Sequence, residues 1–139
     1  QAGWQGLPSV VGEIEALGRQ SLGLFSDVSD SAQVDDMVKR TLERFGKIDI
    51  LINNAGAIPA GRLHEIDDAK WRAVWELKLF GYINMMRAVY PQMEARQSGV
   101  IVNVIGSAAQ NPTARYIAGG GAKCCTLALR ADTLNPREA

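Results

Sequence analysis

The chain has 139 residues, with 15 basic and 15 acidic side chains, so its net charge is zero. That balance gives no reason to expect nucleic acid or an anionic membrane as a partner. No apolar run reaches the length of a membrane span, and no signal-peptide pattern opens the sequence. The length suits one domain with a modest core.

The sulfur and imidazole side chains argue against disulfides and metal sites. Cys124 and Cys125 are neighbours inside a predicted helix, where successive side chains diverge and cannot bridge. We therefore expect a reducing, cytoplasmic location. The single histidine, His64, lies in a predicted loop and is interpreted as a solvated residue, so no metal site is expected.

The first half of the chain alternates helices with short strands. Apolar spacing predicts a helix over residues 7–17, a short strand over 21–25 and a helix from about 30 to Gly46. Residues 48–53 form a nearly continuous apolar run, which is typical of a strand buried on both faces of a parallel sheet.

The second half repeats the alternation. A long helix is predicted over residues 68–95, with Asp67 and Asp68 at its start. A buried strand follows over 100–105, and a last helix runs over 115–133, ended by Asn135-Pro136.

The order α-β-α-β-α-β-α predicts the α/β class with a doubly wound parallel sheet. The strand over 48–53 ends abruptly in Asn53-Asn54-Ala55-Gly56, two amides followed by two small residues. Ligands of open α/β sheets bind just beyond the carboxyl ends of the strands, and small residues there allow close approach.

Several motifs in this order resemble one known family. They are Asp27-Val28 after a strand, Phe45-Gly46-Lys47-Ile48-Asp49-Ile50-Leu51 before Asn53-Asn54-Ala55-Gly56, Trp71 opening a long helix, Ser107 after a strand, and Tyr116 on the next helix. The chain is similar to the short-chain dehydrogenase/reductase family of Rossmann-fold oxidoreductases. This resemblance implies NAD or NADP as cofactor and hydride transfer with a small-molecule carbonyl or alcohol substrate.

The resemblance also implies that residues 1–139 are the central portion of a single NAD(P)-binding domain, incomplete at both ends. The family's glycine-rich phosphate loop and the residue that selects NAD or NADP would precede them, and its last strands would follow. Two family strands would also lie between the strand over 21–25 and the strand over 48–53. Without them, backbone groups of residues 21–25 lack partners, so we expect a longer enzyme.

Carried over by position, the resemblance implies a set of cofactor contacts. Asp27 would accept a hydrogen bond from the adenine amino group, assisted by the backbone of Val28. Asn54, Ala55 and Gly56 would line the adenosine ribose, and Asn54 would also tie neighbouring strands together. The alternative for Asp27 is a cap or turn residue.

Tyr116 resembles the family's acid/base, but its motif is broken. A phenol with a pKa of about 10 needs a nearby cation to exchange protons near neutrality. The family supplies a lysine in Tyr-x-x-x-Lys, which also holds the nicotinamide ribose. Here the fourth residue after Tyr116 is Gly120.

Lys78 is the predicted replacement for that lysine. It lies seven residues after Trp71, where the family usually has an asparagine, and within an otherwise apolar stripe. From there it could lower the Tyr116 pKa and contact the cofactor; the alternative is a lysine that snorkels along a helix interface. Lys123 is the rival, two turns beyond Tyr116, with its Cα about 10 Å away along the axis.

Ser107 resembles the serine that polarises the substrate carbonyl. Residues 108–115 form a shorter spacer to Tyr116 than the family usually has, so a loop-capping serine is the alternative. The family also implies a homodimer or homotetramer through the helices over 68–95 and 115–133.

Two kinds of function remain open. The first is an NAD(P)-dependent oxidoreductase that uses Ser107, Tyr116 and Lys78. The second is a catalytically silent relative, a dinucleotide-binding or oligomerisation module, or a non-functional fragment; the triple glycine at 119–121 favours it.

Overall fold

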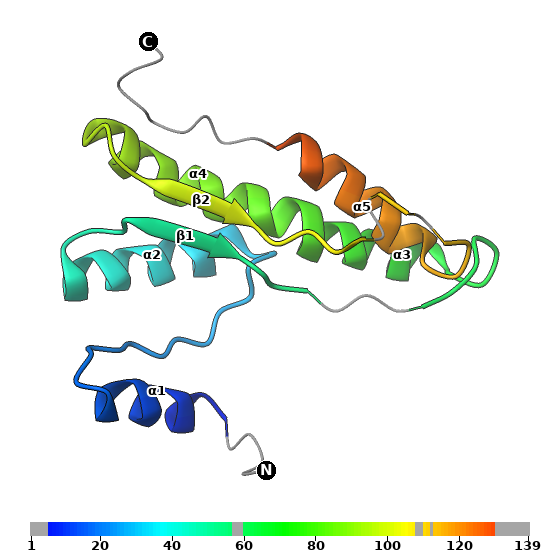
Figure 1. Ribbon diagram of the computed structural model, residues 1–139. Helices are drawn as coiled ribbons and strands as arrows, with labels where there is room; N and C mark the ends of the chain where they lie inside the picture. Colours follow the sequence, from blue (N-terminus) through cyan, green and yellow to red (C-terminus); the bar gives the residue numbers. More distant parts are fainter. Residues whose placement is uncertain (1–5, 57–59, 108–109, 112, 130–139) are drawn as a thin grey trace.

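The computed structural model describes residues 6–56, 60–107, 110–111 and 113–129, and these form several helices and a small parallel sheet (Figure 1). The elements in chain order are α1 (Leu7–Ala16), α2 (Ser31–Phe45), β1 (Ile50–Asn53), α3 (Asp68–Trp75), the π-helical turn η1 (Glu76–Phe80), α4 (Gly81–Ala95), β2 (Val100–Asn103) and α5 (Ile117–Ala128). The predicted alternation of helices and strands is confirmed from α2 onward. No helix of this described part is both long and apolar enough to cross a membrane.

The sheet consists of β1 and β2, which pair in parallel with Ile50 opposite Val100 and Asn53 opposite Asn103. Side chains of a strand alternate between its two faces. On one face Leu51 is 7% exposed, whereas on the other Ile52 is 62% exposed. The prediction that the strand is buried on both faces is therefore wrong for the described residues, because α2 and α4 cover only one face.

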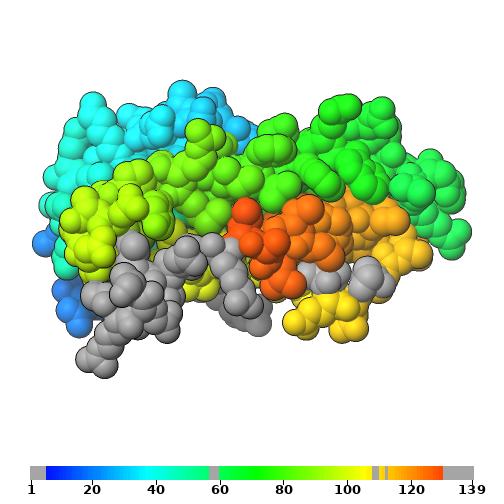
Figure 2. Space-filling view, turned by 90° about the horizontal axis from the view of Figure 1, so that it is seen from above, coloured from blue at the N-terminus to red at the C-terminus, as the bar shows by residue number. Residues whose placement is uncertain are grey.

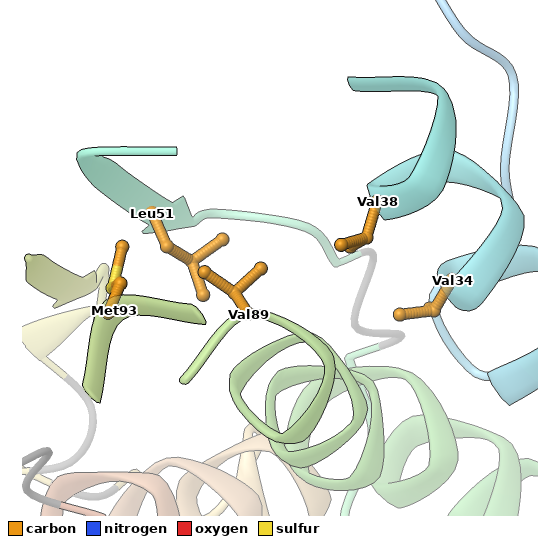
Figure 3. Packing of buried hydrophobic residues seen from close by; sticks show 5 residues of the cluster. All are labelled: Val34, Val38, Leu51, Val89 and Met93. Atoms are coloured by element: carbon orange, nitrogen blue, oxygen red, sulfur yellow. The ribbon is translucent and has the colours of Figure 1, made fainter. Parts of the chain in front are cut away.

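The main core lies between that covered face and the two helices (Figure 3). Its buried members are Val34, Val38, Leu51, Val89 and Met93. Figure 3 shows Leu51 of β1 pointing toward Val89 of α4, with the two valines of α2 beside them. This packing holds the sheet against α2 and α4.

The ends of α2 follow local sequence signals. Asp30 caps the helix by accepting hydrogen bonds from the backbone N–H groups of Ala32 and Gln33, at 2.9 and 3.4 Å. Gly46 ends it in the left-handed conformation, with φ of 77°. The prediction of a helix ending at Gly46 is confirmed.

The prediction of a strand over residues 21–25 is wrong. These residues have no regular structure, and Phe25 is 86% exposed. A strand needs a neighbour for its backbone groups, and the described sheet offers none at this position. The segment instead passes α1, whose Leu7 and Val11 pack on Gly23.

The predicted long helix exists as α3, η1 and α4 in continuous succession, and Asp67 caps its start by accepting from the backbone N–H of Lys70 at 2.8 Å. A second core joins α3 to α5 through Val74, Ala118 and Ala122. Figure 2 shows α4 passing between α2 and α5 on one side of the molecule. Of the predicted last helix, residues 117–128 are helical, and residues 130–136 lie outside the described part.

Candidate active site

The carboxyl ends of the two strands are tied together by their last residues. The amide of Asn53 donates to the amide oxygen of Asn103 at 2.9 Å, and the next pair continues the ladder, with Val104 N–H donating to the Asn53 carbonyl at 2.8 Å. The segments that follow β1 and β2 therefore leave the sheet side by side and in register. The amide that joins the strands is that of Asn53, whereas the sequence interpretation gave this role to Asn54.

Gly56 and Gly106 follow these asparagines by three residues each, so they hold equivalent places beyond the two strands. Gly56 has a φ of +143°, a conformation that favours glycine. A methyl group on Gly56 would overlap the end of the Lys78 side chain, and one on Gly106 would overlap the ammonium of Lys123. Each glycine thus makes room for a lysine.

Lys78 reaches this edge from η1, the π-helical turn in the long helix. Its ammonium lies 5.7 Å from the centroid of the Tyr82 ring. Burial lowers the pKa of Lys78, and the positive charge of Lys123 lowers it further. Lys78 therefore faces the strand ends and not the solvent on the far side of its helix.

Lys123 reaches the same edge from α5. Its ammonium lies 4.8 Å from the centroid of the Tyr116 ring, so this lysine is the cation next to the predicted acid/base. Seven residues make about two helical turns, which puts both side chains on one helix face. The side chains of Tyr116 and Lys123 are long enough to meet although their Cα atoms are about two helical turns apart. In the family motif Tyr-x-x-x-Lys the tyrosine stands four residues before the lysine. Gly119 stands four residues before Lys123, so Lys123 lacks a tyrosine at the motif's spacing.

Tyr116 is held at the entry to α5 by backbone contacts. Its N–H donates to the Thr113 carbonyl at 3.0 Å, and its carbonyl accepts from Gly120 N–H at 2.8 Å. Beside it, Gly61 N–H donates to the Arg115 carbonyl at 2.8 Å. The ring is half-buried next to Lys123, and its hydroxyl makes no hydrogen bond to another described residue.

Tyr82 differs from Tyr116 in this respect. Its hydroxyl donates to the Val104 carbonyl at 3.3 Å, and burial raises its pKa. A phenol used to hold the strand end in this way is poorly suited to proton transfer. Only the fold shows that Tyr82 contacts both Val104 and Lys78.

Ser107 begins a turn after β2. Its carbonyl accepts from the backbone N–H groups of Gln110 and Asn111, at 3.0 and 2.9 Å. Its side chain is exposed, and no hydrogen bond joins it to Tyr116 within the described residues. The structure thus places Ser107 at the expected strand end without bringing the two hydroxyl groups into contact.

Asp27 and Val28 lie at the other side of the β1 end. Asp27 is exposed and accepts from the hydroxyl and the backbone N–H of Ser29, at 2.6 and 2.9 Å, and these bonds lower its pKa. Asn84 of α4 donates to the Val28 carbonyl at 3.1 Å. The Asp27 carboxylate therefore orders its own turn, and Asn84 is a positioning residue that the sequence did not single out.

Asn54, Ala55 and Gly56 continue β1 as exposed or half-buried residues. The positive φ of Gly56 and its missing Cβ leave space that the end of the Lys78 side chain fills, so a group bound to these residues would lie against that lysine. Among the described residues, no group of His, Cys, Asp and Glu side chains could hold a metal ion. Beside the residues that follow β1, the site therefore combines the cations of Lys78 and Lys123, the phenol of Tyr116 and the hydroxyl of Ser107.

Comparison with known proteins agrees with this arrangement. The family model described as short chain dehydrogenase matches residues 4–134. The chain belongs to the short chain dehydrogenase family.

Curated proteins and solved structures of this family are also similar to the chain. It is 38% identical over 116 residues to the (2S)-[(R)-hydroxy(phenyl)methyl]succinyl-CoA dehydrogenase subunit BbsD of Thauera aromatica, covering 80% of this chain and 47% of the relative. The fold matches NAD⁺-bound xylitol dehydrogenase with a TM-score of 0.84 and 26% identity, over 88% of this chain and 48% of that one. It also matches a metagenomic short-chain oxidoreductase in complex with NADP, with a TM-score of 0.83 and 31% identity, over 88% and 56%.

The resemblance to a Rossmann-type α/β fold is thereby confirmed. The chain spans about half the length of the curated relatives it matches. The fold described for this chain therefore corresponds to about half of the xylitol dehydrogenase chain that it matches.

Proposed function

We propose that the protein is an NAD(P)-dependent oxidoreductase acting on a small-molecule carbonyl or alcohol, and that residues 1–139 are the central portion of its single dinucleotide-binding domain. The observation that supports this most directly is the Lys123 ammonium 4.8 Å from the Tyr116 ring, at the carboxyl end of the parallel strands. Relatives with NAD⁺ and NADP bound support either nucleotide as cofactor.

The described residues fit such a cofactor on one side. At the end of β1, Asn54 and Gly56 are exposed and Ala55 is half-buried, and the Lys78 side chain lies against Gly56. We assign the adenosine ribose to these three residues and the adenine to Asp27 and the Val28 backbone. When bound, the nicotinamide supplies or accepts the hydride.

Side chains of the protein would transfer the proton and polarise the substrate carbonyl. Tyr116 gives the proton to the carbonyl oxygen during reduction and takes it back during oxidation. Ser107 donates a hydrogen bond to the same oxygen. Lys123 is the nearer cation to the Tyr116 ring, and Lys78 reaches the same strand ends from η1, so both positive charges lie where the proton is exchanged.

Two finer assignments belong to this proposal. Exposed apolar residues on the outer side of the long helix and of α5, such as Phe80 and Leu127, support a homodimer or homotetramer through these helices. The neighbouring thiols of Cys124 and Cys125, which cannot bridge each other, support a cytoplasmic location.

The test is a set of single substitutions in the whole protein. Tyr116→Phe should lower carbonyl reduction by about 10²–10⁴-fold while NADH or NADPH binding persists, because only the transferred proton is lost. Lys78→Met and Lys123→Met should each abolish turnover with the fold retained. Loss in Lys123→Met alone would remove Lys78 from the proton-transfer role.

A catalytically silent relative is the second candidate, and one observation favours it. Gly119 stands four residues before Lys123, where the family motif has its tyrosine. Cofactor binding without turnover across a broad panel of carbonyls, unchanged by Tyr116→Phe, would support this candidate over the enzyme.

A further inference from the structure

The two lysines at the strand ends form a pair of like charges, and no acidic side chain of the described residues pairs with either. Lys78 lies over Gly56 and Lys123 over Gly106, and these glycines are equivalent positions of paired strands. Neighbouring parallel strands are about 4.8 Å apart, so the two side chains converge on one small region. Every ion pair among the described residues involves other side chains.

The pair carries more positive charge than one phenol requires. Lys123 is already next to Tyr116, whereas Lys78 lies by Tyr82, whose hydroxyl is bound to the Val104 carbonyl. A half-buried ammonium close to another ammonium is unfavourable unless an anion joins them. Burial is the main cause that lowers the pKa of Lys78, and the charge of Lys123 adds to it.

We propose that Lys78 and Lys123 together bind a carboxylate of the substrate, so that the substrate class is oxo acids and hydroxy acids. This inference rests on the proposed function, because it names the substrate of that same site. Two ammonium groups reaching in from η1 and α5 can each donate to one carboxylate oxygen. The carbonyl of an oxo acid would then lie near Tyr116, on the Lys123 side of the pair.

A binding experiment tests the site without turnover. Malonate is titrated by calorimetry into the whole protein saturated with NADH, and malonamide serves as its uncharged analogue. Malonate should bind and malonamide should not. Lys78→Met should weaken malonate binding by about 10–100-fold, the effect of one lost charged hydrogen bond, and Lys39→Met, an equal charge change on the exposed face of α2, should not.

Two outcomes would overturn the inference at this stage. Equal affinity of wild type and Lys78→Met for malonate would show that the lysine pair is not an anion site. Malonate that binds only when NADH is absent would show that the pair recognises a cofactor phosphate and not a substrate carboxylate.

A turnover experiment then separates this inference from the proposed function. A panel of 2-oxo and 3-oxo acids is compared with the corresponding methyl esters. Preference of the wild-type protein for the acids supports the inference. Reduction of the esters with no preference for the acids overturns it and leaves the oxidoreductase proposal intact. Lys78-dependent malonate binding with no turnover of any carbonyl overturns the oxidoreductase and the substrate assignment, and retains the anion site.

Discussion

The two faces of the small sheet carry similar apolar side chains but differ in what covers them. Leu51 and Asn53 point into the core formed with α2 and α4, whereas Ile50 and Ile52 of the same strand are mostly exposed. An apolar side chain therefore does not by itself report burial in this chain. What decides burial is whether another element covers the face, and the described elements cover only one.

The largest effect is expected on the covered face. Leu51→Ala removes a buried side chain that packs against Val89 and Met93, and it should lower the free energy of unfolding by about 2–5 kcal/mol. Urea denaturation followed by circular dichroism measures the change. A loss below about 1 kcal/mol would mean that this core closes around the gap, contrary to its described packing.

A polar residue on the same face provides the next test. Asn53→Ala leaves the amide oxygen of Asn103 without its donor in a partly buried place, which should cost about 1–3 kcal/mol. The control is Asn54→Ala, whose side chain is exposed and which should have little effect. Equal losses in the two variants would show that the Asn53–Asn103 bond does not stabilise the strand pair.

Asp30, which caps α2 on the covered face, should make the stability of the protein depend on pH. Hydrogen bonds from the Gln33 side chain and from the backbone N–H groups of Gln33 and Ala32 lower the pKa of Asp30 below 3.8. The stabilisation is present above pH 3.8 and is lost as the pH falls below it toward the lower pKa of the folded state. Asp30→Asn keeps a capping side chain but should remove this pH dependence, whereas Asp30→Ala should destabilise α2 at neutral pH. An unchanged acid profile in Asp30→Asn contradicts the assignment.

The smallest effect is expected on the uncovered face. Ile52→Ala should change the free energy of unfolding by less than about 0.5 kcal/mol, because most of the side chain is already in water. The same urea titration used for Leu51→Ala measures it. A loss comparable to that of Leu51→Ala would show that something covers this face in solution.

Much of the fold was predictable because its signals are local. The Asp30 cap, the Gly46 stop and the apolar stripe of α2 lie within one segment, and so do the apolar runs of β1 and β2. The strand expected over residues 21–25 failed because a strand depends on neighbours that local sequence does not contain.

The site was harder to predict than the fold. The sequence could place Tyr116 and Ser107 after their strand, but not the fit of Lys78 over Gly56, which depends on how η1 meets the end of β1. Lys123 was underestimated because Cα positions ignore the length of the side chains that bring it to Tyr116. The match between Gly56 and Gly106 could have been found by aligning the two strands.

The π-helical turn η1 lets one continuous helix serve two cores. Before it, Val74 of α3 packs toward α5; after it, Val89 and Met93 of α4 pack toward β1. Each residue of an α-helix advances the side-chain direction by about 100°. Deleting a single residue of η1 would therefore rotate the side chains of α4 by that angle relative to those of α3. The number of residues between Val74 and Val89 is therefore fixed, and the segment can accept substitutions far more readily than changes in length.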